Sequence, residues 1–145
     1  MANELLKKRR TRITAQSSSA LTAGQYPEDG SYTATANCTS LDNSISASDG
    51  QPKGAHYLNL ELDVTTAPTT AATANIYWRG SEDGGTKWTD WRYSHTVGKA
   101  IGTTADNYSA GIFELEFGLT EIAVSAIGYG FTSVLYATPK LKEVQ

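Results

Sequence analysis

The feature that most constrains the fold is an alternation of apolar and polar residues near the middle of the chain. Four apolar residues alternate with three polar ones: Leu58, Leu60, Leu62 and Val64, with Asn59, Glu61 and Asp63 between them. Successive side chains of a β-strand point to opposite faces of its sheet, so this pattern predicts a strand with one buried face. Period-two patterns recur along the chain and helical periodicity does not, which favours an all-β fold.

Turn residues separate the other segments that alternate in this way. We expect further strands at residues 32–39, 41–47, 74–78, 91–97, 113–117, 122–127 and 131–137. Thr and the eight Tyr suit half-buried pleated surfaces and strengthen this interpretation. Seven or eight short strands of this kind predict a single antiparallel β-sandwich, jelly-roll-like, over residues 26–145.

The N-terminal segment differs from the rest in charge and composition. The formal net charge is −3, but residues 1–12 hold five basic side chains against one acidic, a charge of +4, and the other residues carry −7. Residues 14–24 are mostly Ser, Thr and Ala, with too little apolar surface to offset the entropy lost on ordering. We therefore expect residues 1–25 to form an extended basic arm and linker that orders only on a partner.

Side chains that carry chemistry are sparse. Cys38 has no second cysteine to pair with, and one Cys with two His cannot form a closed zinc site without carboxylates. His56 and His95 have no neighbouring nucleophile, and His95 is expected to be a satisfied core or interface residue. We expect no enzyme activity, no metal and no cofactor. No membrane partner is expected either, because no apolar run approaches about 18 residues.

The most distinctive motif lies in residues 78–91. Ser81, Asp83, Gly85 and Trp88 match most of the Asp-box pattern of sialidase-like propellers, although Lys87 stands where that pattern has Thr. In the motif, an Asp side chain caps backbone N–H groups of a tight turn, glycines supply positive φ and the aromatic ring packs beneath. One imperfect copy indicates a structural turn and not a sialidase.

The same segment contains all three Trp of the chain, so sugar stacking is a second interpretation. Trp78 and Trp91 fall on the apolar phase of their expected strands, which favours a core or inter-subunit position. Trp88 lies in the loop and is expected to be the exposed one. With Asp83 and Asp90 it forms a candidate exposed binding loop.

A basic arm at residues 1–10, a Thr/Ser/Ala linker, a small β-sandwich, the hairpin at 76–85 and the chain end at 136–145 occur together in this sequence. In this combination the chain resembles virion proteins of tailed bacteriophages, and among them the capsid decoration (cement) proteins. The resemblance implies a jelly-roll-like body, a homotrimer, and binding to the major capsid protein on the outer surface of the virion capsid. It also implies synthesis in the cytoplasm of the bacterial host, and it carries over no catalytic residues.

The arm has an expected role in attachment. Leu5 and Leu6 would fill an apolar pocket on the capsid, and five basic residues would meet acidic capsid side chains: Lys7, Lys8, Arg9, Arg10 and Arg12. Nucleic acid is not expected as a partner, because no aromatic residue before Tyr26 could stack on a base. Two alternatives stay open: a glycan-binding module of a tail fibre or baseplate, and a head–tail or neck adaptor.

Overall fold

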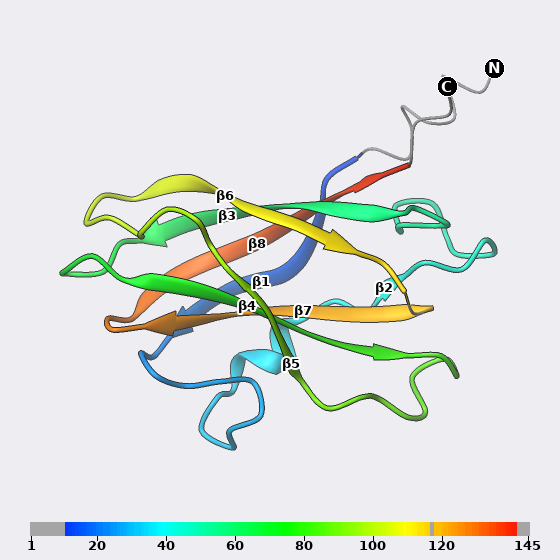
Figure 1. The fold of residues 1–145 in the computed structure, drawn as a ribbon, viewed down its shortest axis with the longest axis horizontal. Coiled ribbons are helices and arrows are strands. Elements are labelled where there is room, and N and C mark those ends of the chain that lie inside the picture. The colour runs from blue at the N-terminus through cyan, green and yellow to red at the C-terminus, as the bar shows by residue number, and fades with distance from the viewer. Residues whose placement is uncertain (1–10, 117, 142–145) are drawn as a thin grey trace.

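Two antiparallel four-stranded β-sheets pack together in the computed structural model, which describes residues 11–116 and 118–141 (Figure 1). The elements are β1 (Ile13–Leu21), the 3-10 helix η1 (Ala34–Asn37), β2 (Leu41–Asp42), β3 (Tyr57–Thr66), β4 (Thr73–Ser81), β5 (Arg92–Thr96), β6 (Asp106–Glu114), β7 (Leu119–Ile127) and β8 (Phe131–Lys140). Sheet A has the strand order β1-β8-β3-β6, and sheet B has the order β2-β7-β4-β5. The predicted all-β sandwich is confirmed.

The core lies between the sheets, and the apolar face of β3 forms a large part of it. All four apolar residues of the alternating pattern are buried, as predicted: Leu58, Leu60, Leu62 and Val64. Sheet B contributes Ile76 from β4 and Ile122 and Val124 from β7 to the same cluster. Full burial of one such side chain is worth about 1.5–3 kcal/mol before entropy is subtracted.

Residues 14–24 do not form the partner-dependent linker that their composition suggests, and for most of the segment that prediction is wrong. Residues Ile13–Leu21 form β1, which pairs antiparallel with β8 from Ile13↔Ala137 to Leu21↔Phe131. Backbone pairing with a strongly patterned neighbour satisfies the N–H and C=O groups of a Ser-rich segment, a contribution that composition does not reveal. The folded body therefore includes β1 and does not begin at residue 26.

Gln16 connects the two sheets through its side chain. The pairing of β1 with β8 is irregular on both sides of Gln16, and this residue is only 1% exposed. Its Oε1 accepts a hydrogen bond from the Val124 N–H of β7 at 3.0 Å. Its Nε2 donates to the Tyr32 hydroxyl at 2.9 Å and to the Ala34 carbonyl at 3.1 Å. Because β2 pairs with β7 only at Leu119 and Thr120, Gln16 satisfies part of the β7 edge that no strand covers.

Other predicted strands are shorter than expected or shifted. Residues 32–39 include η1 instead of a strand, and only Leu41–Asp42 of residues 41–47 is a strand. Alternating Thr and small side chains offer little apolar surface to bury, and the Asp42 carboxylate accepts the Ser44 N–H at 3.0 Å in a turn that follows β2. The strand expected at 113–117 is β6, which lies earlier, at Asp106–Glu114.

Arg12 is held on the body of the protein. Its Nη1 lies 3.2 Å from Glu61 Oε2, and its guanidinium carbon lies 3.8 Å from the centre of the Tyr136 ring. Glu61 and Tyr136 alternate with the buried residues of β3 and β8, so both face outward from sheet A. The other predicted arm residues lie outside the described residues: Leu5, Leu6, Lys7, Lys8, Arg9 and Arg10.

Candidate functional site

The loop between β4 and β5 is built around Asp83, as the Asp-box resemblance implies. Asp83 Oδ1 accepts hydrogen bonds from the Lys87 N–H and the Ser81 hydroxyl, both at 2.9 Å, and these bonds lower the pKa of Asp83. The Ser81 hydroxyl in turn accepts the Gly85 N–H at 2.9 Å. Gly85 has a φ of 94°, a backbone conformation that favours glycine. The Asp83 carboxylate therefore stabilises this turn through its two hydrogen bonds.

Trp88 packs against a cation of its own chain. The guanidinium carbon of Arg79 lies 4.5 Å from the centre of the Trp88 ring and 5.1 Å from that of Trp91. The same guanidinium forms a salt bridge with Glu121, with Arg79 Nη2 2.6 Å from Glu121 Oε1. Trp88 is consequently half-buried and covers an ion pair, so the expectation that it is an exposed platform is not met.

The predicted binding loop is only partly assembled. Asp83 and Trp88 line one open groove of about 390 Å³, whereas Asp90 is exposed and is not among its lining residues. Trp91 is buried in the core cluster, and Trp78 packs against that cluster with its ring centre 5.5 Å from that of Phe113. The predicted core position is therefore confirmed for Trp91, whereas Trp78 is half-buried and packs against the core.

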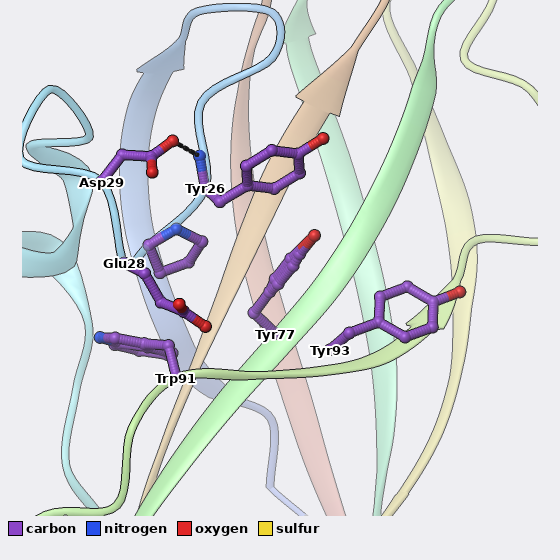
Figure 2. A pocket seen from close by; sticks show the side chains of 7 residues that line it. Tyr26, Glu28, Asp29, Tyr77, Trp91 and Tyr93 are labelled. Atoms are coloured by element: carbon purple, nitrogen blue, oxygen red, sulfur yellow. Dashed lines mark hydrogen bonds between the residues drawn. The ribbon is translucent and has the colours of Figure 1, made fainter.

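A different surface gathers aromatic side chains around a pocket of about 270 Å³ (Figure 2). We call it the aromatic pocket. Its lining residues come from the turn after β1, from β4, and from β5 with the residue before it: Tyr26, Pro27, Glu28, Asp29, Tyr77, Trp91 and Tyr93. Chain segments far apart in the sequence therefore build it.

Three tyrosines form a row along one side of the pocket. The Tyr26 and Tyr77 ring centres are 5.6 Å apart at an interplanar angle of 68°, and those of Tyr77 and Tyr93 are 5.8 Å apart at 67°. These are edge-to-face contacts, which aromatic quadrupoles favour. Tyr26 and Tyr93 remain 39% and 56% exposed, so their rings offer apolar surface to solvent or to a ligand.

Local structure explains why these rings meet. Tyr77 lies on the outward phase of β4, and a register irregularity between Ile76 and Tyr77 places it opposite Tyr93 of β5. The turn that begins at Tyr26 is closed by two hydrogen bonds: the Asp29 N–H donates to the Tyr26 carbonyl at 2.8 Å, and the Tyr26 N–H donates to Asp29 Oδ2 at 3.1 Å. The buried Pro27 fixes this turn against the sheet.

The aromatic pocket has negative electrostatic character. Glu28 and Asp29 are acidic, and none of its seven lining residues is basic. Burial raises the pKa of Tyr77, and the negative charge of Glu28 adds to this effect. Figure 2 places the Glu28 carboxylate between the Trp91 and Tyr77 side chains. A ligand that carries negative charge is disfavoured here.

The sequence did not point to this pocket. Residues 27–30 are recognisable as a turn. In the strand expected at residues 91–97, strict alternation puts Tyr93 on the same buried face as Trp91 and His95, and this prediction is wrong because Tyr93 is 56% exposed. The irregular pairing of β4 with β5 changes the phase. One signal was present: Tyr77 follows Asn75 on the polar phase of its strand, which puts an aromatic side chain on the outer face of the sheet.

The remaining candidates for chemistry have structural partners. His95 Nε2 donates to the Ala110 carbonyl at 2.6 Å, and its Nδ1 lies 2.8 Å from the Ser94 hydroxyl, so this half-buried histidine is satisfied, as predicted. Cys38 packs against the core, and burial raises the pKa of its thiol to about 12, which keeps the thiol protonated at neutral pH.

Within residues 11–116 and 118–141, no three His, Cys, Asp or Glu residues are grouped to hold a metal ion. No helix in that part is long and apolar enough to cross a membrane.

The part of the chain that the structure describes is a β-sandwich, and the aromatic pocket on the outer face of sheet B is its candidate ligand site. No family model, curated protein or solved structure matches the chain.

Proposed function

We propose that the chain is a virion structural protein that binds and stabilises the outer surface of a phage capsid, as a cement or decoration protein. The observation that carries the proposal is a strongly basic N-terminal segment joined at Arg12 to an acidic β-sandwich. Residues 1–12 have a charge of +4 and the rest of the chain −7, so the two parts suit different partners.

The order of the strands supports this proposal. Each strand pairs with its counterpart counted from the other chain end: β1 with β8, β2 with β7, β3 with β6 and β4 with β5. We assign this wrapping to the jelly-roll class, which includes viral capsid domains and lectins. A shared fold is an analogy and does not by itself define function, so the charge of the arm carries the argument.

Attachment through the arm has a physical rationale. Lys7, Lys8, Arg9 and Arg10 would pair with acidic side chains of the major capsid protein, and Leu5 and Leu6 would fill an apolar pocket. A protein that binds only the expanded capsid stabilises that state by mass action. In a homotrimer each copy can bind weakly, because the second and third contacts occur at high effective concentration.

Deletion of residues 1–10 tests the proposal directly. This variant keeps Arg12 and all of β1 and should stay folded, whereas deletion of residues 1–25 would also remove β1 and is unsuitable. We expect the full chain to co-sediment with expanded capsids of the virus that encodes it, and the shortened chain to stay in the supernatant. A variant with Gln at Lys7, Lys8, Arg9 and Arg10 should bind capsids more weakly than the unmodified chain. Its affinity should also fall less than that of the unmodified chain when the salt concentration is raised. Undiminished co-sedimentation of the shortened chain would contradict the proposal.

The number of copies of the protein per virion distinguishes a position on the capsid shell from one in the neck or the tail. A decoration protein covers the whole shell, whereas a neck adaptor occupies one vertex and a tail-fibre or baseplate module occupies the tail. Quantitative mass spectrometry of purified virions should give a copy number comparable to that of the major capsid protein. A copy number that matches a single ring would favour the adaptor instead.

A further inference from the structure

We propose that the aromatic pocket binds one neutral pyranose residue of a glycan, stacked on its tyrosines and hydrogen-bonded to Glu28 and Asp29. This site differs from the loop of Asp83, Trp88 and Asp90 that the sequence suggested. The inference does not depend on whether the chain is located on the capsid shell or on the tail.

The apolar side of the pocket suits the C–H face of a sugar ring. Tyr93 is 56% exposed and Tyr26 39% exposed, so part of each ring surface is available. Scattered exposed aromatic residues are common on protein surfaces, but here Tyr77 contacts both Tyr26 and Tyr93, and all three tyrosines line one pocket. Aromatic rings provide large contact areas at a low cost in conformational entropy, because each has only two side-chain torsions to fix.

The polar side offers the hydrogen-bond groups that sugar hydroxyls need. Glu28 is exposed, and no hydrogen bond or ion pair of its carboxylate is seen among the described residues. Asp29 uses Oδ2 to accept the Tyr26 N–H, which leaves Oδ1 for a ligand. Carboxylates accept strong, charge-assisted hydrogen bonds from hydroxyl groups. The Tyr93 hydroxyl is hydrogen-bonded to the Thr96 hydroxyl at 2.7 Å, and because a tyrosine hydroxyl can both donate and accept, it keeps one further hydrogen-bonding position for a ligand.

Charge and ring spacing narrow the ligand class. With two carboxylates and no basic residue in the lining, the pocket disfavours phosphates and acidic sugars. A cation cage needs aromatic walls that stand apart to admit the cation, whereas neighbouring tyrosines here are in direct contact at 5.6 and 5.8 Å. A ligand therefore lies on an exposed tyrosine face and not between two rings, and the C–H face of a chair-shaped pyranose suits such a surface.

The size of the pocket limits how much of the glycan it can hold. Pockets for drug-sized ligands have volumes of about 300–1,000 Å³, and this pocket has about 270 Å³. The pocket has room for one sugar ring, and the other sugar residues of a glycan would extend into solvent.

The test uses the full-length protein labelled for NMR and four neutral probes: the methyl pyranosides of glucose, galactose, mannose and N-acetylglucosamine. We expect at least one probe to cause saturable shifts at Tyr26, Tyr77 and Tyr93 and to receive saturation transfer from their rings. Tyr93→Ala and Glu28→Gln should each weaken this binding about tenfold, the effect of losing one ring contact or one charged hydrogen bond. Tyr129→Ala is the matched control, since Tyr129 is 45% exposed but does not line the pocket.

Each alternative outcome is informative. The proposal is overturned if none of the four probes shifts the pocket tyrosines at tens of millimolar, or if tetramethylammonium chloride binds there and the sugars do not. It is also overturned if Trp88→Ala abolishes sugar binding while Tyr93→Ala leaves it unchanged. Capsid co-sedimentation by Tyr93→Ala should equal that of the unmodified chain, which separates failure of this inference from failure of the attachment proposal.

Discussion

Replacement of Gln16 by Leu should destabilise the protein although the two side chains have similar volumes. In the native structure the Gln16 amide makes three buried hydrogen bonds, to the Val124 N–H, the Tyr32 hydroxyl and the Ala34 carbonyl. Leu would leave the Val124 N–H without a partner in a buried setting, and the Ala34 carbonyl would keep only the weak hydrogen bond from the Cys38 thiol at 3.9 Å. Tyr32 would keep its bond to the Val124 carbonyl at 2.7 Å.

The magnitude follows from these contacts. An unsatisfied buried donor or acceptor costs about 1–3 kcal/mol, so the two together cost roughly 2–6 kcal/mol. Burial of the more apolar Leu side chain returns up to about 2 kcal/mol. Subtracting the full return from the cost leaves a loss of roughly 0–4 kcal/mol in the free energy of unfolding, with a central value of about 2 kcal/mol. For a domain of this size, the central value corresponds to a fall in Tm of roughly 4–8 °C.

Urea denaturation followed by Trp fluorescence measures this loss. Gln25→Leu is the matched control, because Gln25 is half-exposed and should change stability by less than about 0.5 kcal/mol. Combined with Tyr32→Phe in a double-mutant cycle, Gln16→Leu should show a coupling energy of about 0.5–3 kcal/mol, since the two side chains share a hydrogen bond. If Gln16→Leu unfolds at the same urea concentration as the control, Gln16 does not stabilise the junction between the sheets.

Three further outcomes test other parts of the structure. Gly130→Ala should lower Tm, because the added Cβ would collide with the carbonyl oxygen at the end of β1. Gly98→Ala is the control and should leave Tm unchanged, because no atom lies within 4 Å of a Cβ added there. Equal Tm values for the two variants would argue against the position of β1. Burial raises the pKa of Cys38 to about 12, so a thiol reagent should label it only as urea unfolds the protein, and rapid labelling without urea would contradict this. The pKa of Asp83 is lowered from 3.8 by hydrogen bonds to its charged form, so the loop should stay intact as pH falls to that value and loosen only below it. NMR shifts of the Lys87 amide should titrate accordingly, and a midpoint at or above 3.8 would refute the assignment.

Much of the sandwich could be predicted because its central strands carry their own pattern. The alternation in β3 and the apolar runs of β7 and β8 indicate strands without reference to any neighbour. β1 gives no such signal, because Ser17 and Ser18 occupy its exposed positions and the buried positions include Gln16 and Ser19. Its place in the sheet depends on pairing with β8 and on hydrogen bonds to β7, which link residues about a hundred positions apart in the chain.

The candidate site was harder to predict, because nothing in a single segment defines it. Trp88 is a candidate for binding because it is a tryptophan in a loop. In the structure, however, its ring packs on the guanidinium of Arg79, which forms a salt bridge with Glu121. Tyr26, Tyr77 and Tyr93 come from three segments and meet only after the sheet has formed. The register irregularity between β4 and β5 decides that Tyr93 faces outward, and alternation alone predicted the opposite.

The positions of Arg12 and of the aromatic pocket relate the two proposals to each other. Arg12 rests on Glu61 and Tyr136, which face outward from sheet A, whereas Tyr77 faces outward from sheet B. Packed sheets lie about 10 Å apart with their outer faces directed away from each other. The N-terminal segment therefore joins the sandwich on the side opposite to the pocket. A body attached through that segment, with sheet A toward its support, leaves the pocket open to solvent, so attachment and sugar binding need not compete for the same surface.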